Sequence, residues 1–277
     1  MLGVIGGSGL YDMPGLSAHE ERRVETPYGA PSDAILLGKL DGKPVAFLPR
    51  HGRGHKIPPH EINFRANIVA LKTLGCTRVL SLSAVGSMKE AIHPGDVVVV
   101  DQFIDRTRQR PQSFFTTGLV GHVALADPVC AELADGLYAA AETSPARAHK
   151  GGTYLCVEGP QFSTRAESHE FRSLGVAVIG MTNAPEYKLA REAGLCYATL
   201  ALATDYDCWH EGHDAVTVEQ VIAVMKKNVA NAQAIVRSVA AKLDEKRSCS
   251  CAGAGARGVI TSEKDAAVVE RLRAILG

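Results

Sequence analysis

An apolar run in the second half of the chain constrains the fold more than any other feature. Residues 195–203, LCYATLALA, carry no charged side chain, and the run is too short to span a bilayer. A short and almost continuous apolar run predicts a strand that is buried on both faces. Such a strand requires a sheet that other elements cover on both sides.

Short apolar segments of this kind alternate with helical patterns along the chain. Strands are expected at 2–6, 44–49, 78–83, 96–100, 176–180 and 196–203. Helices are expected at 61–74, 127–141, 164–173, 184–193 and 218–244. The alternation predicts an α/β fold around a largely buried central sheet, in which ligands bind beyond the carboxyl ends of strands.

The end of the chain differs in composition from the rest. The Gly- and Ala-rich stretch 248–258 predicts a linker, and 262–276 predicts an amphipathic helix. The chain is therefore expected to divide into a domain at 1–247 and a tail at 248–277.

The charge balance narrows the class of partner. The chain of 277 residues has 30 basic and 30 acidic side chains, so its formal net charge is zero. This balance favours neither a nucleic acid nor a membrane surface as partner. Met1 is followed directly by LGVIGGSG rather than by a signal-like segment, so a cytoplasmic location is expected.

The chain has seven cysteines, and one pair is closely spaced. Cys249 and Cys251 form a Cys-Ser-Cys motif, which could be a redox pair or half of a metal site. No second cysteine pair or histidine pair stands near it in the sequence, so no metal site is expected. Disulfide bonds are the alternative if the source grows at very high temperature.

Two strand ends carry groups suited to an anion. The turn GGSG after the first strand offers backbone amides and the hydroxyl of Ser8. Arg50 and His51 follow the second strand in PRHGRGHK, and an arginine fork matches phosphate oxygens. Glycine-rich turns and basic loops are also common without a ligand. Together they predict a phosphate site.

Further strand ends carry small, aromatic and hydroxyl side chains. Ser83 and Ala84 lie in SAVGSM, which would leave room for a ligand or form a tight packing turn. Phe162, in VEGPQFSTRAES, would stack on a flat heterocycle or belong to the core. Met181 and Thr182 follow another strand, where core filling and helix capping are the alternatives.

Two carboxyl groups end the apolar run itself. Asp205 and Asp207 stand in ATDYDCWH at the mouth of the buried strand. Ionising both in a dry site is costly, so such a pair favours holding at least one proton. A pair of loop or capping carboxylates is the alternative.

Taken together, these motifs resemble one enzyme family. IGGSGLYD, PRHGRGHKIPPHEINFRANI, SAVGSM, VEGPQFSTRAE, MTNAPE and ATDYDCW occur in the order and spacing of the trimeric purine nucleoside phosphorylases. The resemblance covers roughly residues 1–243 and is strongest to the branch that acts on methylthioadenosine. It implies a single domain with a central mixed, twisted β-sheet flanked by helices, and a homotrimer or a dimer of trimers.

The resemblance also implies the reaction and the roles of residues. Phosphate, a co-substrate, attacks C1′ of the nucleoside and the purine leaves; no metal or organic cofactor is implied. The implied phosphate ligands are Ser8, Arg50, His51, Ser83, Ala84 and Thr182. Asp205 and Asp207 would be catalytic at the purine edge, with Asp205 at N7. The implied nucleoside contacts are Met181, Phe162, His122 from a neighbouring subunit, Val218, Val221 and Ile222.

One departure from the family pattern bears on the purine edge, and two other functions are alternatives. Asn183 in MTNAPE replaces a commoner residue, and relatives that act on 6-oxopurines recognise their base through an asparagine near the position of Asp205. The nearest alternative is a broader phosphorylase acting on adenosine or on inosine and guanosine. A non-catalytic purine-binding protein on the same fold is the alternative from another class.

Overall fold

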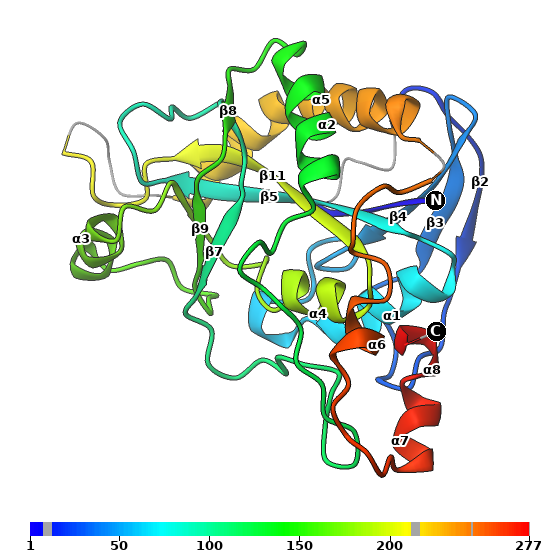
Figure 1. Cartoon of the computed structure of the whole chain (residues 1–277). Helices are drawn as coiled ribbons and strands as arrows, with labels where there is room; N and C mark the ends of the chain where they lie inside the picture. Colours follow the sequence, from blue (N-terminus) through cyan, green and yellow to red (C-terminus); the bar gives the residue numbers. More distant parts are fainter. Residues whose placement is uncertain (8–12, 212–216, 245, 277) are drawn as a thin grey trace.

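The computed structural model describes residues 1–7, 13–211, 217–244 and 246–276. A central β-sheet is covered by helices on both faces, so the molecule has three layers (Figure 1). Helices α2 (Ala131–Glu142) and α5 (Val218–Lys242) cover one face, and α1 (Phe64–Thr73) and α4 (Glu186–Glu192) cover the other. The expected α/β class and the single domain with a mixed, twisted sheet are confirmed.

The centre of the sheet is parallel. The long strand β5 (Arg78–Ser87) pairs in parallel with β1 (Leu2–Gly6) on one side and with β11 (Cys196–Asp205) on the other. β4 (Lys43–Pro49) pairs in parallel with β1. The carboxyl ends of these four strands therefore meet at one edge of the sheet, which is where open α/β sheets bind ligands.

The sheet becomes mixed towards its periphery. β10 (Val178–Gly180) runs antiparallel to β5, and β6 (Val97–Val99) runs antiparallel to β11. The strands that complete the sheet are β2 (Leu16–Arg22), β3 (Ile35–Leu40), β7 (Gln102–Asp105), β8 (Ala148–Lys150) and β9 (Thr153–Cys156).

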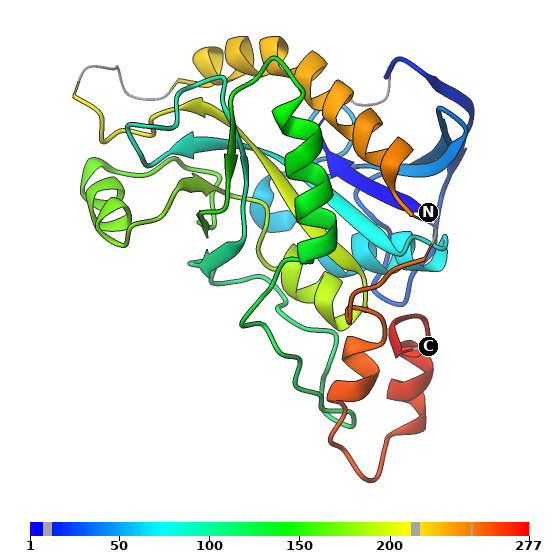
Figure 2. The ribbon, with the colours of Figure 1, turned by 45° about the horizontal axis from the view of Figure 1, so that its top comes forward.

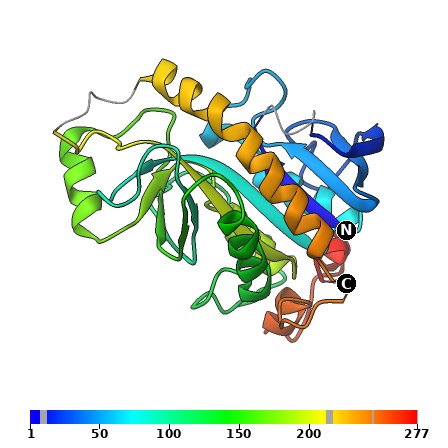
Figure 3. The ribbon, with the colours of Figure 1, turned by 90° about the horizontal axis from the view of Figure 1, so that it is seen from above.

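Strand β11 is buried on both faces, as its composition predicts. Tyr197 and Ala201 belong to the apolar cluster on the side of α1 and α4. Leu200 and Leu202 point the other way, into the cluster that contains apolar side chains of α2 and α5. Those two helices pack against each other over the sheet (Figure 2), and seen from above α5 runs in the same general direction as the long strand β5 (Figure 3).

The expected central strands and helices are present, and the wrong predictions concern the peripheral strands of the sheet and the ends of elements. All six expected strands are found: the first has the expected bounds 2–6, and the other five have shifted bounds. Strands β2, β3, β7, β8 and β9 were not expected. Strand β2 reads LSAHEER, and its charged residues hide the strand pattern. The helix expected at 127–141 begins only at Ala131, after its N-cap Cys130. Helix α3 (Arg165–Ser173) begins at the capping box that Thr164 forms with Glu167.

The tail differs from expectation. Residues 248–258 are not a plain linker, because they include helix α6 (Ala254–Gly258) and the buried Cys251. The single helix expected at 262–276 is two short helices, α7 (Ala266–Arg271) and α8 (Arg273–Leu276). The carboxylate of Asp265 caps α7 and sets its start. Leu272 and Ile275 pack into the cluster shared with α1 and α4.

None of the described helices is long and apolar enough to cross a membrane.

Candidate active site

Two hydroxyl groups meet beside the carboxyl end of β5. Ser83 lies on β5, and Thr182 follows β10. Because Ile179 of β10 pairs with Gly86 in the antiparallel sense, the chain leaving β10 returns along β5 towards Ser83. The side-chain oxygens of Ser83 and Thr182 are 3.0 Å apart, and both residues are buried. The structure therefore brings together two hydroxyls that lie about a hundred residues apart in sequence.

Arg50 lies beside this pair, at the end of β4. It is 2% exposed, and its Nε and Nη2 donate to the two carboxylate oxygens of Glu186 at 2.9 and 3.0 Å. Its Nη1 donates to the carbonyl of Leu82, next to Ser83 in the chain. A buried guanidinium is tolerated when a carboxylate pairs with it through two parallel hydrogen bonds and its remaining N–H groups also find acceptors. The position of Arg50 is thus fixed by the end of β4 that it follows, by Leu82 of β5 and by Glu186 of α4.

A layer of polar side chains behind Arg50 fixes Glu186 in turn. The hydroxyl of Tyr197 donates to Glu186 at 2.9 Å, and Asn183 donates to Tyr197 at 2.8 Å and to Thr199. Asn183 is fully buried. It therefore belongs to this support layer. The sequence did not mark Glu186 as a site residue, because its partner Arg50 is 136 residues away.

The next residue, His51, carries an uncharged ring. Its Nδ1 lies 2.9 Å from the carbonyl of Ile57, and its ring stacks on His55 at 4.2 Å. Burial lowers the pKa of His51 to about 4, and the positive charge of Arg50 acts in the same direction. At neutral pH the Nδ1–H donates to Ile57, so Nε2 is left as an acceptor.

The carboxyl pair lies at the end of β11. The pairing of β11 with β5 shifts register between Ala203 and Asp205, so that Asp205 stands opposite Gly86. A β-carbon on Gly86 would lie 2.9 Å from Asp205 Oδ1 and 3.3 Å from the β-carbon of Asp207. The glycine therefore leaves the space that both aspartates occupy. Asp207 adopts a left-handed backbone conformation, with φ of 51°.

Both carboxyl groups are held in an environment that favours a proton. Burial raises the pKa of Asp205, and the charge of Asp207 adds to the effect. Hydrogen bonds that Oδ2 accepts from Thr204 and Oδ1 accepts from the Asp207 amide oppose it. Burial also raises the pKa of Asp207. The pair can therefore supply a proton and an acceptor at the same place.

Met181 is placed between the hydroxyl pair and a glycine-bearing loop. A β-carbon on Gly159 would lie 2.6 Å from Met181 Sδ, so the loop approaches the thioether closely only as glycine. The carbonyl of Met181 accepts a hydrogen bond of 2.8 Å from Arg110, which also donates to Ala184 and pairs with Glu158. Sequence reasoning missed Arg110, because its role depends on partners from distant loops.

The remaining predicted residues that the structure describes lie at least partly on the surface of the single chain. Phe162 is 46% exposed, and Val218 and Ile222, on the first turns of α5, are 55% and 49% exposed; Val221 is half-buried. Ala84 is exposed on β5 beside Ser83, and Ser8 lies outside the described residues. The exposed His122 donates its backbone N–H to the carbonyl of Gly258 in α6. Helix α6 lies away from the carboxyl ends of β5 and β11 (Figure 1).

The arrangement suits an anion beside a weak acid. Hydroxyls and a fixed guanidinium gather near Ser83, and a buried carboxyl pair stands three residues further along β5 at Gly86. Such a site can hold phosphate and protonate a leaving group. Within the described residues, the side chains grouped closely enough to hold a metal are four cysteines around the opposite end of β11.

Comparison with a family model and with known sequences points to the same family. The model of the phosphorylase superfamily matches residues 1–241. An S-methyl-5′-thioadenosine phosphorylase from Geobacter sulfurreducens is 56% identical, over 100% of this chain and 98% of its own length. One from Koribacter versatilis is 54% identical, over 100% and 95%.

Solved structures agree with these sequences. A methylthioadenosine phosphorylase from an Antarctic soil metagenomic library superposes with a TM-score of 0.94 at 48% identity, covering 100% of this chain and 98% of its own. A variant of the adenosine/methylthioadenosine phosphorylase of Schistosoma mansoni, in complex with methylthioadenosine, has a TM-score of 0.81 at 38% identity, covering 87% and 90%.

Proposed function

The chain belongs to the phosphorylase superfamily, and we propose that it is an enzyme that cleaves S-methyl-5′-thioadenosine with inorganic phosphate. The products are adenine and 5-methylthioribose 1-phosphate, so the enzyme is a pentosyltransferase of purine and methionine salvage. Relatives that share more than half of its residues over the whole chain carry this name. The observation that carries the proposal is the buried carboxyl pair beside the Ser83–Thr182 hydroxyl pair.

Phosphate would lie against the hydroxyl pair. Ser83 and Thr182 offer O–H donors, and the guanidinium of Arg50 supplies positive charge from behind them. His51, neutral at pH 7, would accept the hydrogen of a monoprotonated phosphate at Nε2. Ser8 and the amide of Ala84 would complete the set. Holding phosphate in line with C1′ lowers the activation barrier, because the entropy of orienting the two reactants is lost on binding and not in the reaction step.

The purine would leave against the carboxyl pair. As the C1′–N9 bond breaks, its electron pair passes to the purine, and the protonated carboxyl of Asp205 donates to N7. A phosphate oxygen forms the new bond to C1′. Asp207 would accept a hydrogen bond from the 6-amino group. Burial, which raises the pKa of both carboxyls, supports a proton held by the pair.

The sugar and its 5′ group would be bound partly by a second subunit. Met181 would lie under the ribose, and Phe162 would stack on the base. Val218, Val221 and Ile222 would line the methylthio pocket, and two of them are exposed apolar side chains in the single chain. His122 would enter a neighbour's site, which supports a homotrimer or a dimer of trimers. A cytoplasmic location stays a prediction.

Adenosine is the second candidate substrate. The relatives from Schistosoma mansoni are named adenosine/methylthioadenosine phosphorylases, and the carboxyl pair suits any 6-aminopurine. Inosine is disfavoured, because its 6-oxo group would meet a carboxylate acceptor and not a donor.

Base release from methylthioadenosine, adenosine and inosine, each with and without phosphate, tests the proposal. We expect phosphate-dependent release of adenine and the highest kcat/KM for methylthioadenosine. Release without phosphate would identify a hydrolase, and binding without release would identify a purine-binding protein. A preference for inosine would contradict the roles given to Asp205 and Asp207.

A further inference from the structure

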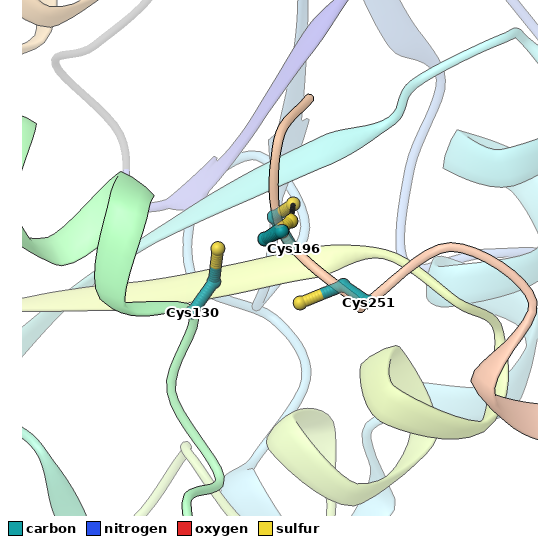
Figure 4. A group of neighbouring side chains, drawn as sticks. Cys130, Cys196 and Cys251 are labelled. Atoms are coloured by element: carbon teal, nitrogen blue, oxygen red, sulfur yellow. Dashed lines mark hydrogen bonds between the residues drawn. The ribbon is translucent and has the colours of Figure 1, made fainter. Parts of the chain in front are cut away.

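Four cysteines that are scattered in the sequence converge at one place in the fold. Cys130 is the N-cap of α2, Cys196 is the first residue of β11, and Cys249 and Cys251 lie in the tail. Their Sγ atoms all lie within 4.8 Å of one another. The side chains of Cys130, Cys196 and Cys251 point towards a common centre from three separate segments (Figure 4). The motif Cys249-Ser-Cys251 therefore has the ligand partners that its sequence neighbourhood lacks.

The spacing of the sulfurs matches a tetrahedral metal site. A tetrahedron with metal–sulfur distances of about 2.3 Å has sulfur–sulfur edges of about 3.8 Å. Cys196 Sγ and Cys249 Sγ are 3.3 Å apart, and no pair exceeds 4.8 Å. All four cysteines are free thiols in the structure. One compact group of four, and not two separate pairs, is the arrangement that a single ion requires.

The surroundings favour thiolate ligands. The Nη1 group of Arg191 donates to Cys251 Sγ at 3.7 Å, and Nη1 of Arg247 donates to Cys196 Sγ at 3.9 Å. Four thiolates around a divalent ion leave a net charge of −2, and two guanidinium groups at the sulfurs offset it. Cys130 lies at the N-terminal end of the twelve-residue helix α2, where the helix dipole stabilises a negatively charged thiolate.

Three of the four ligands are buried and Cys249 is half-buried, which points to a structural ion. Cys130, Cys196 and Cys251 are at most 4% exposed and lie in the apolar cluster beneath α2 and α5. Four soft ligands in a closed tetrahedral site are typical of zinc, and a catalytic zinc would keep one position open. We propose that Cys130, Cys196, Cys249 and Cys251 together bind one structural Zn²⁺ ion, releasing their thiol protons as it binds.

The ion would fasten the tail to the core. The carboxylate of Glu132, on α2, already accepts hydrogen bonds from the amides of Ser248 and Cys249. Beyond Cys251, the chain forms α6, whose last residue Gly258 accepts a hydrogen bond from the amide of His122. A metal at the cysteines would therefore fix the starting point of the segment that supports His122.

Metal analysis of the full-length protein tests the proposal without reference to activity. After purification under reducing conditions we expect about one zinc per chain, and its release by a mercurial should require all four thiols. Replacement by Co²⁺ should give the intense visible bands of tetrahedral thiolate coordination. Two disulfide bonds in the mass spectrum, four free thiols without metal, or stoichiometric iron would each overturn the assignment.

Variants locate the ion. Cys249→Ser and Cys251→Ser should each lose most of the zinc and lower Tm. Cys76→Ala is the matched control, because Cys76 is a buried thiol that packs near Gly3 outside the cluster, and it should keep the wild-type zinc content. If the serine variants fail to fold, zinc release from the wild-type chain still decides the question. Full zinc content in a folded Cys251→Ser protein would contradict the proposal.

Discussion

At the scale of single residues, the carboxyl pair gains its chemistry from burial. An exposed aspartate is ionised at pH 7 and cannot donate to a purine nitrogen. Asp205 ends a buried strand, and its desolvation outweighs the two hydrogen bonds that favour its charged form, so its pKa is raised. The residue type alone predicts none of this, whereas its position at the end of β11 does.

Substitution of Asp205 tests its assignment at N7. Asp205→Ala removes the donor, and losses of this kind cost about 10²–10³ in kcat. Asp205→Asn keeps a donor but not an acid, so it should lose activity on methylthioadenosine and gain relative activity on inosine. Steady-state kinetics with both nucleosides measure these changes. If both variants keep the wild-type kcat and substrate preference, the role belongs to Asp207.

From the lowered pKa of His51 we expect the folded protein to lose stability on acidification. Its folded pKa is lowered to about 4 from 6.5, so the unfolded chain binds the proton more tightly. The free energy of unfolding should therefore fall as the pH drops from 6.5 towards 4, and should be unaffected by this group above 6.5. Urea titrations of His51→Gln should show a flatter profile in this window. His169→Gln, at an exposed histidine of α3 that is not among the groups acting on the pKa of His51, is the control.

At the scale of elements, the site depends on how β5, β10 and β11 are registered. The antiparallel return of β10 brings Thr182 to Ser83, and the register shift in β11 brings Asp205 to Gly86. The ion pair of Arg50 with Glu186 joins the end of β4 to the start of α4. Each contact links two elements whose sequences lie far apart, so the pairing of strands assembles the site.

Gly86→Ala tests the register between β5 and β11. The added β-carbon would lie 2.9 Å from Asp205 Oδ1 and 3.1 Å from Ile179, so the carboxyl must move. We expect kcat to fall at least tenfold, since displacement of a positioned group by about 1 Å can cost a hundredfold. Gly136→Ala on α2, where a β-carbon meets nothing within 4 Å, should leave kcat unchanged. An unchanged kcat in Gly86→Ala would show that Asp205 needs no fixed position.

At the scale of the whole molecule, the single chain leaves parts of the proposed site open. Apolar residues on the first turns of α5 are exposed, and His122 is held by α6 away from the strand ends (Figure 1). A neighbouring subunit that contributes His122 would close the site. Oligomerisation would then be required for nucleoside binding.

His122→Ala tests this dependence. Removing the side chain should raise KM for methylthioadenosine more than KM for phosphate, because phosphate would be held within one chain. Sedimentation should show the same oligomer for the variant and the wild type, which separates a binding role from an assembly role. A fully active wild-type monomer would rule out the shared site.

The sequence by itself determined the fold class and the candidate groups. Continuous apolar strands must be covered on both faces, so LCYATLALA and its alternation with helical patterns already implied a buried sheet between helices. Gly, Arg, Ser and Asp at the strand ends marked the candidate site, since their side chains are chemically suited to an anion and a proton. Edge strands such as β2 were not predicted, because their polar residues obscure the apolar pattern of a strand.

Tertiary structure alone decided which groups meet. The partnership of Arg50 with Glu186, the burial of Asn183 behind the site, and the space left at Gly86 all depend on contacts between distant segments. The same is true of the cysteines, because Cys130 and Cys196 reach Cys249 and Cys251 only after α2, β11 and the tail have packed. Local sequence determines which helix or strand each segment can form. The packing of these elements determines which side chains become neighbours, and those neighbours determine the burial and charge of each group in the site.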